Sequence, residues 1–546
     1  MAGQIPDDAT VYGAVKSASE RFGARDFLNV LPETAAVYGI EPRAWTYAQA
    51  FAEIERLRLA YEAAGYRAGG RVMLLMENRP AFFLHWFALN ALGLSVVPVN
   101  PDLQSSELDY MAGHAEPVLA VAIAARVSDL EKASASSGVG FPVITPEDAP
   151  PPLSDHLAGF CKDASATPLR REAAMLYTSG TTGKPKGCVL SNLYFLAAGR
   201  WYADAGGYCS LTEDGERMIT PLPIFHMNAM AYSLMAMVSV GGCLTALDRF
   251  HPRSWWQSVR DSKATCLHYL GVMPSMLMKA EPSAADRDHA VRFGFGAGID
   301  PKLHGPFEDR FGIPLVEAWA MTETGAGAVI AANHEPRKRG TSCLGRTRDG
   351  VEARIVTDAG EDAAPGEPGE LLVRHAGEDP RYGFFTEYYK NADATAEAWD
   401  GGWFHTGDIV ARDADGDVFF VDRKKNVIRR SGENIAAVEV ESILMQHPDV
   451  RAAGVAALPD ELRGDEVFAC LVVDGGGDEA KARAIVSWCL ERVAYYKAPG
   501  YIAFVDALPL TATQKIQRSE LKGLAARLAL DPATVNTCAM KKRQAA

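Results

Sequence analysis

The sequence predicts an α/β protein with a large N-terminal domain of layered, mostly parallel sheets with helices outside, followed by a small C-terminal α+β domain. Three observations lead to this prediction. The 546 residues exceed the size at which a single core keeps growing, so two or more domains are expected. Helical and strand-like patterns alternate between residues 46 and 123, as in βαβ units. From residue 418 the pattern changes to short strands around one helix, which indicates a separate unit of about 120 residues.

The N-terminal elements follow from apolar periodicity and from helix start and stop signals. Thr46 is expected to cap a helix that ends at Gly65, because apolar residues recur between them at helical spacing. Pro80 then opens a second helix that runs to Leu92. Strands are predicted at residues 72–76, 95–99 and 118–123, with a helix at 107–113.

The rest of the chain repeats this rhythm and then changes. Residues 134–168, rich in Pro, Ser and Ala, are expected to form a surface connection. Residues 173–179 are predicted as a strand and 192–204 as a helix. A strand at 418–421 is predicted just before a basic turn, and the small domain should then contain a helix at 436–447 and strands at 452–456 and 467–473. The predicted boundaries are 1–424 for the large domain, 425–532 for the small domain and 533–546 for a frayed basic tail.

Composition excludes several classes of protein. A formal net charge of −14 argues against binding to nucleic acid, which requires a basic face. The nine cysteines are scattered and never form a C-x-x-C pair, which favours reduced core thiols and a cytoplasmic location over disulfides or a zinc site. The N-terminus lacks a secretory signal, and the most apolar run, 229–242, is too short for a transmembrane segment.

The most informative motif is the run LYTSGTTGKPKG at residues 176–187, which follows a predicted strand. Glycines let a backbone approach an anion closely, while successive N–H groups and lysine ammonium groups supply the opposing charge. The spacing differs from the phosphate loop of NTPases, since two residues separate Gly180 from Gly183 and a proline follows Lys184. The run therefore predicts a polyphosphate-binding loop of another class. Its expected contact residues are Thr178, Ser179, Gly180, Thr181, Thr182, Gly183, Lys184 and Lys186.

Further segments follow this loop in a fixed order. They read PLPIFHMN at 221–228, GFGAG at 294–298, EAWAMTET at 317–324, WFHTGD at 403–408, DRKKNVIRRSGENI at 422–435 and LPLTATQKIQR at 508–518. Each fragment alone also fits an ordinary turn, capped helix or solvated basic stretch. Together they make the chain similar to the adenylate-forming superfamily of acyl-CoA synthetases, 4-coumarate CoA ligases, beetle luciferases and peptide-synthetase adenylation domains. The small domain looks closest to the carnitine/crotonobetaine CoA ligase-like branch.

The resemblance implies a site for ATP and Mg²⁺. An aromatic ring at Trp319 can stack on adenine, and the carboxylate of Glu323, beside Thr322, suits Mg²⁺ as a hard ligand. Asp408 would accept hydrogen bonds from the ribose hydroxyls. Family enzymes usually carry tyrosine and glycine where this chain has Trp319 and Ala320. The remaining residues expected beside the nucleotide are Ala297, Gly298, Glu317 and Ala318.

The resemblance also assigns residues to the acid, to CoA and to domain motion. His226 is expected on the acyl and pantetheine side. Arg423 would contact ribose or phosphate oxygens, Lys425 falls at the hinge of a mobile small domain, and Gly432 would face the site when CoA binds. Lys515 matches the catalytic lysine, although Gln514 replaces the usual glycine before it. The acyl pocket candidates are mostly apolar and suggest a short or medium acid: Met227, Met230, Met273, Ala297, Trp319 and Ala320.

The implied activity is that of an AMP-forming acid–CoA ligase. A small carboxylic acid attacks ATP to give acyl-AMP and pyrophosphate, and CoA then displaces AMP. Lys515, Thr322, Glu323 and His226 are the expected catalytic residues. Three alternatives stay open: an adenylation enzyme that loads a carrier protein, a luciferase-type oxidative enzyme, and a noncatalytic nucleotide-binding homologue. A homodimer is left open as the assembly.

Overall fold

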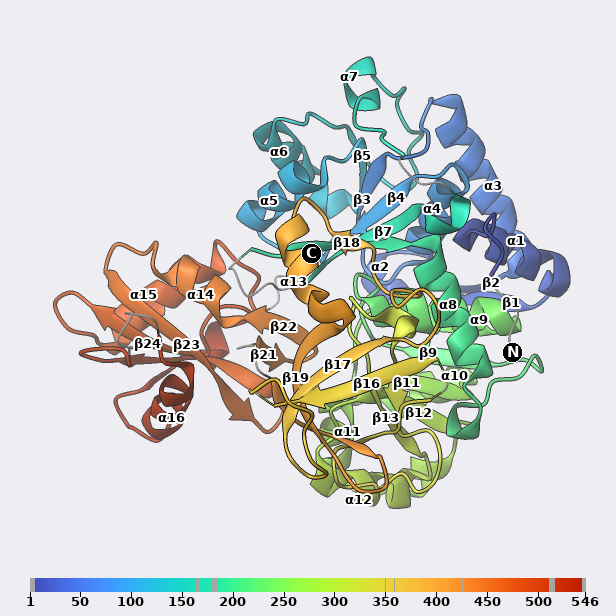
Figure 1. The fold of residues 1–546 in the computed structure, drawn as a ribbon. Coiled ribbons are helices and arrows are strands. Elements are labelled where there is room, and N and C mark those ends of the chain that lie inside the picture. Colours follow the sequence, from blue (N-terminus) through green and yellow to red (C-terminus); the bar gives the residue numbers. More distant parts are fainter. Residues whose placement is uncertain are drawn as a thin grey trace. The chain divides into compact units, whose positions relative to one another are not determined.

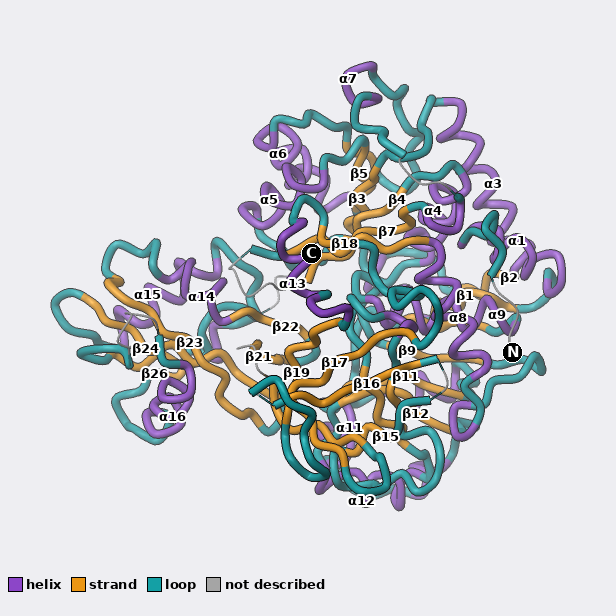
Figure 2. Tube along the Cα trace, in the orientation of Figure 1, coloured by secondary structure: helices purple, strands orange, loops and turns teal. Residues whose placement is uncertain are grey.

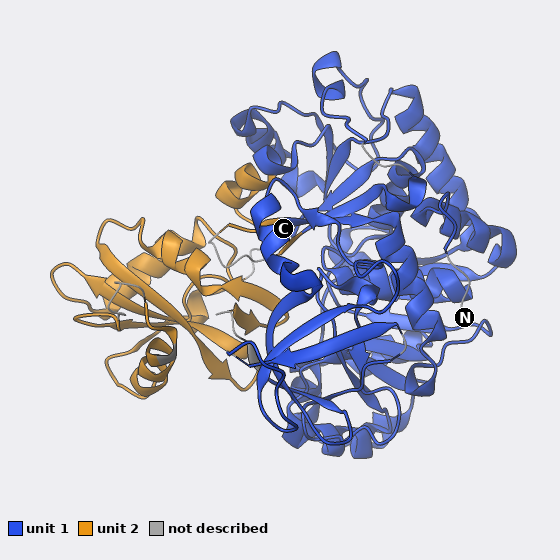
Figure 3. Cartoon of the chain, in the orientation of Figure 1, with its two compact units in different colours: residues 1–101, 112–176, 187–422 blue, residues 102–111, 177–186, 423–546 orange. Residues whose placement is uncertain are grey.

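The computed structural model describes residues 5–163, 167–178, 184–348, 350–357, 359–423, 427–509 and 516–542 (Figure 1). The side chains of Asp422, Arg423 and Ser519 fall outside this description. Internal contacts divide the chain into two compact units (Figure 3). Unit 1 holds residues 1–101, 112–176 and 187–422, and unit 2 holds 102–111, 177–186 and 423–546. Two short stretches of the N-terminal part therefore group with the C-terminal part, which the expected division after residue 424 did not include.

The first sheet is mostly parallel and has the strand order β18-β8-β7-β4-β3-β5-β6. Every residue of β4 and β5 is buried, as expected for parallel strands that are covered on both faces. The strands are β3 Arg71–Leu75, β4 Ser95–Pro98, β5 Leu119–Ala122, β6 Val143–Ile144, β7 Glu172–Thr178, β8 Lys186–Ser191 and β18 Glu387–Tyr388. These bounds confirm the strands predicted from apolar runs in this part of the chain.

The helices begin where the sequence places caps. Thr46 caps α3 in a capping box with Gln49, and Gly65 follows its end with a φ of 86°. Pro80 starts α4, and α3 and α4 pack together beside the strands of the first sheet (Figure 2). The helices up to the end of unit 1 are α1 Val11–Phe22, α2 Pro32–Tyr38, α3 Tyr47–Ala63, α4 Pro80–Ala91, α5 Ser105–Ala115, α6 Val127–Ser137, α7 Asp155–Ala158, α8 Asn192–Asp204, α9 Met235–Val240, α10 Trp255–Asp261, α11 Val272–Met278, α12 Pro301–Phe311 and α13 Ala392–Ala398.

The second sheet, in unit 1, has the order β14-β13-β12-β11-β9-β10-β1-β2. Its central strands β10, β9, β11, β12 and β13 run parallel, and Gly296 of β12 pairs with Glu317 of β13. The carboxyl ends of β11, β12 and β13 therefore meet at one edge. The strands are β1 Asp26–Val30, β2 Arg43–Thr46, β9 Arg217–Thr220, β10 Cys243–Ala246, β11 Cys266–Leu270, β12 Phe293–Ala297, β13 Leu315–Trp319 and β14 Ile330–Ala331.

The third sheet is antiparallel and has the order β15-β20-β19-β17-β16. Its strands are β15 Cys343–Gly345, β16 Val351–Val356, β17 Gly369–His375, β19 Phe404–Arg412 and β20 Val418–Arg423. The register between β17 and β19 shifts at Glu370, whose carboxylate accepts from the backbone N–H of Gly407 at 3.0 Å. Gly407 has a φ of 68°, which a residue with a side chain rarely adopts. Such a bulge re-aims the next side chain, that of Asp408.

The connection expected over residues 134–168 lies largely at the surface, but it also contains regular structure that the prediction did not include. Helix α6 continues to Ser137, the two-residue strand β6 pairs with β5, and α7 is a single turn. Val139, Phe141 and Leu157 are buried, whereas most small residues of the segment are exposed or half-buried. A few apolar side chains therefore anchor a segment that otherwise lies at the surface.

Unit 2 is built around a sheet of order β22-β21-β24-β25-β26, with β23 also paired to β24. The helix predicted at 436–447 is confirmed as α14, and the strands predicted at 452–456 and 467–473 are confirmed as parts of β23 and β24. The elements are β21 Val427–Arg430, β22 Glu433–Ala436, α14 Ala437–Leu444, β23 Val450–Asp460, β24 Gly464–Val473, α15 Glu479–Leu490, β25 Tyr501–Phe504, α16 Arg518–Leu528 and β26 Val535–Asn536.

Residues up to 542 of the expected tail are part of unit 2. Val535 of β26 pairs with Ile502 of β25. Lys541 is buried and donates to Glu466, which also accepts from Arg430 at 2.8 Å. The basic run was expected to be solvated, but one of its lysines has a buried carboxylate as its partner.

All nine cysteines are free thiols, and all but Cys161 and Cys538 are buried, which confirms the expected core thiols. None of the described helices is long and apolar enough to cross a membrane.

Candidate functional site

A backbone turn at the carboxyl end of β12 forms the centre of the candidate site. A Cβ atom at Gly271, just after β11, would lie 1.6 Å from the carbonyl oxygen of Gly298, so the two turns touch through bare backbone. Gly298 itself has a φ of 80°, and a Cβ there would meet no atom within 4 Å. The turn after Ala297 therefore borders open space at the edge where parallel sheets bind ligands.

Glu317 holds this turn in place. It is fully buried in β13, and its carboxylate accepts hydrogen bonds from the N–H groups of Gly298 at 2.9 Å and Ile299 at 3.3 Å, and from the hydroxyl of Tyr269. Burial raises the pKa of Glu317, and these three hydrogen bonds oppose that rise. The carboxylate thus binds the protein's own backbone, and its neighbour Ala318 pairs with Ala331 of β14.

Trp319 and Asp408 come together from two different sheets. Trp319 ends β13, Asp408 lies in β19, and both side chains are buried. The indole N–H of Trp319 donates to Oδ2 of Asp408 at 2.8 Å. Thr406 supports this contact, since its hydroxyl donates to the carbonyl of Leu371 and accepts from the N–H of Asp408. The adenine-side aromatic and the ribose-side carboxylate expected from the sequence are therefore in direct contact.

Glu323 is buried in the turn that follows β13. The hydroxyl of Tyr388 donates to Oε1 of Glu323 at 2.9 Å, and the backbone N–H of Phe385 donates to the carbonyl of Glu323. Burial and the nearby Glu323 raise the pKa of Tyr388, which keeps the phenol protonated as a donor. The half-buried Thr322 accepts at its carbonyl from the hydroxyl of Tyr194 at 2.9 Å. A carboxylate oriented in this way suits Mg²⁺ as a hard ligand.

Sequence reasoning missed Tyr388 and Tyr269, which hold the predicted carboxylates. They lie 65 and 48 positions from their partners, so no local spacing connects them. Tyr388 follows Glu387 in a short two-residue strand, where an aromatic residue gives little signal.

A buried polar cluster surrounds His268, next to the segment whose His226 was expected on the acyl side. His268 of β11 is buried, with Nδ1 2.7 Å from Oδ1 of Asn228 and Nε2 3.0 Å from the hydroxyl of Tyr202. Burial lowers the pKa of His268 to about 3, so the ring is neutral at physiological pH. Asn228 begins a π-helix, Asn228–Leu234, a form often found at functional sites. The sequence singled out His226 two residues earlier, whose ring lies 4.8 Å from that of Phe225, but not His268.

The residues suggested for the acyl pocket differ in their surroundings. Met230 and Met273 are buried, and Met273 belongs to a packed apolar cluster with Tyr269 and Ile299. Met227 and Ala320 are half-buried.

Several predicted site residues fall outside the described residues. They are residues 179–183 of the phosphate loop, Lys425, Gln514 and Lys515, together with the side chain of Arg423. In unit 2, Thr178 ends β7, Lys186 begins β8, and the ammonium group of Lys184 lies 5.2 Å from the ring centre of Tyr110. Gly432 has a φ of 94° and follows Ser431 in the two-residue turn between β21 and β22.

Three aspartates in the loop after β19 resemble a cation site but have a protein partner. Asp413, Asp415 and Asp417 lie close together, and the ammonium group of Lys338 forms ion pairs with all three. Arg346 adds a further pair to Asp417 at 2.7 Å. Two cations from outside the loop, Lys338 and Arg346, therefore offset much of its negative charge.

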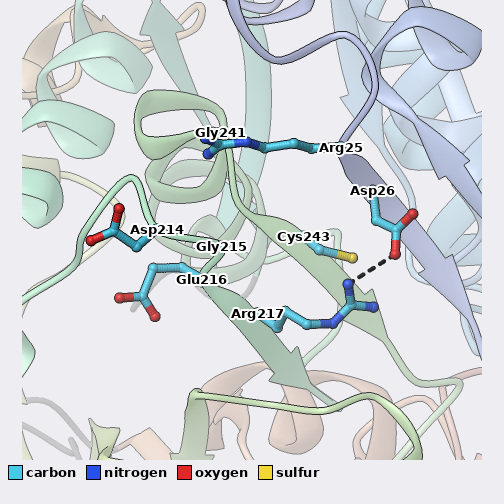
Figure 4. A pocket seen from close by; sticks show the side chains of 8 residues that line it. All are labelled: Arg25, Asp26, Asp214, Gly215, Glu216, Arg217, Gly241 and Cys243. Carbon is cyan, nitrogen blue, oxygen red and sulfur yellow. Dashed lines mark hydrogen bonds and ion pairs between the residues drawn. The ribbon is translucent and has the colours of Figure 1, made fainter.

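A hollow of about 510 Å³ lies at the opposite edge of the second sheet (Figure 4). Its lining includes Asp26, Arg217 and Cys243, the first residues of β1, β9 and β10. Arg217 pairs with Asp26 at 2.9 Å, and Glu216 pairs with Arg292. Ligands of α/β sheets bind at the carboxyl ends of the strands, so this hollow is not part of the candidate site.

Family models match most of the chain. A model described as AMP-binding enzyme matches residues 25–383, and one described as AMP-binding enzyme C-terminal domain matches residues 439–515. A crotonobetaine/carnitine–CoA ligase from Shigella flexneri is 30% identical over 490 residues, which cover 88% of this chain and 93% of the relative.

Solved structures share the fold. The o-succinylbenzoate CoA synthetase of Bacillus subtilis aligns with a TM-score of 0.77 and 23% identity over 93% of this chain and 97% of that one. The ATP-bound MatB of Rhodopseudomonas palustris aligns with a TM-score of 0.64 and 25% identity over 95% of this chain and 99% of that one. A malonyl-CoA ligase with methylmalonyl-CoA and AMP bound aligns with a TM-score of 0.74 and 26% identity over 91% of this chain and all of that one.

Proposed function

Because the chain belongs to the family of AMP-binding enzymes, we propose that it is an ATP-dependent acid–CoA ligase. It joins a carboxylic acid to AMP with release of pyrophosphate, and it then transfers the acyl group to CoA. The observation that carries this proposal is how β13 connects three features. Its Glu317 holds the Gly298 turn at the carboxyl edge of the second sheet, and its Trp319 binds Asp408 beside the bulge of the third sheet. An aromatic face, a bare backbone turn and a buried carboxylate are what adenine and ribose require.

The first half-reaction brings two anions together, so it depends on positioning and on opposing charge more than on a covalent nucleophile. Glu323, oriented by Tyr388, offers the oxygen that would hold Mg²⁺, which shields phosphate charge when bound. The loop at 178–186 would hold the pyrophosphate group. Lys515 would neutralise charge between the acid and the α-phosphate.

The second half-reaction needs access for the CoA thiol. The Gly432 turn is proposed to face the site in this step, with Lys425 as the hinge that absorbs the backbone change. CoA is the proposed acceptor because the relatives include CoA ligases over nearly their full length. A luciferase-type or carrier-loading enzyme would share the first half-reaction.

The acid is proposed to be short or medium in length. Tyr232 of the π-helix packs with Tyr202 and Phe295 at ring-centre distances of 5.0–6.5 Å, and the neutral His268 lies against the rings of Tyr202 and Phe295. A long acyl chain would have to displace these buried rings. Carnitine- and crotonobetaine-like acids belong in the test set because the curated relatives act on them.

The test is AMP and pyrophosphate formation with a panel of short, medium, aromatic and betaine-type acids, each with and without CoA. Acid-dependent AMP release together with an acyl-CoA product is the expected result. Pyrophosphate release without any thioester would indicate a carrier-loading enzyme, and oxygen uptake would indicate luciferase-type chemistry. Failure of every acid to drive AMP formation would favour a noncatalytic nucleotide-binding protein.

A further inference from the structure

We propose that Trp319 is a positioning residue whose indole N–H orients the Asp408 carboxylate toward the ribose hydroxyls and so sets the preference for ribonucleotides. The inference rests on the proposed function, because it assigns a role within the nucleotide site. The sequence motif predicted only that Trp319 stacks on adenine. The hydrogen bond from Nε1 of Trp319 to Oδ2 of Asp408 is 2.8 Å long and joins residues 89 positions apart in the chain. It gives Trp319 a second role.

The backbones on both sides of this bond are fixed. Trp319 pairs with Ile330 of β14, so its main chain is part of the second sheet. The N–H of Asp408 donates to the hydroxyl of Thr406, which donates in turn to the carbonyl of Leu371 in β17. The indole N–H of Trp319 restricts the torsions of the Asp408 side chain. Both side chains are less than 10% exposed, so water competes little for this bond.

The chemistry of the two groups leaves the carboxylate able to bind a diol. A carboxylate has about four lone-pair sites, and an indole N–H is a donor that can occupy one of them. The indole N–H therefore occupies one lone-pair site of the carboxylate. Because it cannot accept a hydrogen bond, it does not compete with the carboxylate for a ribose hydroxyl. A tyrosine hydroxyl can donate or accept, so it fixes the carboxylate less strictly. Trp319 thus combines a flat face for the base with a donor for the group that reads the sugar.

The experiment measures ribose selectivity by calorimetry on the full chain. Dissociation constants are determined for ATP, 2′-deoxy-ATP and 3′-deoxy-ATP, and selectivity is the ratio of each deoxynucleotide's constant to that of ATP. Trp319→Phe keeps an aromatic face and removes the N–H. We expect its selectivity to fall by about tenfold, which is the size of one hydrogen bond to a charged group. If Trp319 only stacked on adenine, Trp319→Phe would weaken the binding of all three nucleotides by the same factor.

A matched control is available in the same unit. Trp255 is also buried, and among the described residues its indole N–H has no hydrogen-bond partner. Trp255→Phe removes the same atoms from a packed core without removing a bond to a carboxylate. Its ribose selectivity should equal that of the unmodified protein.

A double-mutant cycle with Asp408→Asn completes the test. The amide keeps the shape of the side chain but offers one acceptor oxygen, so selectivity should fall and Trp319→Phe should reduce it little further. Independent losses in the double variant, or an equal loss for ATP and both deoxynucleotides in Trp319→Phe, would overturn the positioning role. Trp319→Tyr serves if the phenylalanine variant does not fold, and it too should lose selectivity. If the unmodified protein binds no ATP, the proposed function itself fails, and this result is distinct from a uniform loss.

Discussion

Replacement of Tyr388 by phenylalanine should weaken the binding of Mg²⁺ that we propose for Glu323. The Tyr388 hydroxyl lies 2.9 Å from Oε1 of Glu323, and both residues are 7% exposed. A hydrogen bond to a charged group contributes about 1.5–3 kcal/mol, and loss of a residue that orients a metal ligand lowers metal affinity by about 10–100-fold. We therefore expect the Mg²⁺ concentration for half-maximal activity to rise by about tenfold, the lower end of that range.

The assay follows acid-dependent AMP formation over a range of free Mg²⁺ at fixed ATP. Saturating Mg²⁺ should restore most of the rate, because the variant keeps the Glu323 carboxylate. Tyr389→Phe is the matched control: this adjacent hydroxyl donates to Glu116, also at 2.9 Å, away from Glu323. An unchanged Mg²⁺ profile in Tyr388→Phe, or the same shift in both variants, would refute the reasoning.

Three further outcomes are expected. Lys515→Ala should abolish acyl-AMP formation and spare thioester formation from supplied acyl-AMP, measured as separate half-reactions; equal loss of both steps would contradict its role. Lys541→Met should destabilise unit 2 in urea unfolding by about 3 kcal/mol, because it removes a buried partner of Glu466; a change below about 1 kcal/mol would show that the ion pair contributes little. Burial disfavours the charged form of Glu308, but hydrogen bonds from Arg337, from a histidine and from a backbone N–H outweigh it and lower the pKa to about 2. A lowered carboxyl pKa contributes stability that is complete above the unfolded value of 4.5 and is lost as pH falls toward 2. The melting-temperature gap between the unmodified protein and Glu308→Gln should therefore be constant above about pH 5.5 and shrink below pH 4.5; a gap independent of pH would exclude this linkage.

Much of the fold could be predicted because parallel strands that are buried on both faces appear in the sequence as continuous apolar runs. Helices α3 and α4 have cap signals at Thr46 and Pro80, and the structure begins them there. The regular structure within 134–168 was missed because β6 has two residues and α7 has four, too few to show a period. The tail was misjudged because a buried lysine looks the same in sequence as a solvated one.

The candidate site could be predicted in part for a similar reason. Trp319, Glu323 and Asp408 lie in short motifs that follow one another along the chain, so a resemblance carries them. The contact between Trp319 and Asp408 could not be foreseen, since it depends on how two sheets pack. His268 gave no signal either, because a histidine within an apolar strand looks like an ordinary core residue.

The packing of Gly271 against Gly298 limits how this protein can acquire a new specificity. A single methyl group at position 271 would overlap the facing carbonyl, so neither drift nor a designed library can alter that turn one residue at a time. Ala320, just beyond β13, is half-buried and is not a glycine packed against a facing carbonyl. Substitutions at position 320, beyond β13, are therefore expected to give active variants. Substitutions at position 271, after β11, are expected to give inactive ones, so directed evolution of specificity should begin beyond β13.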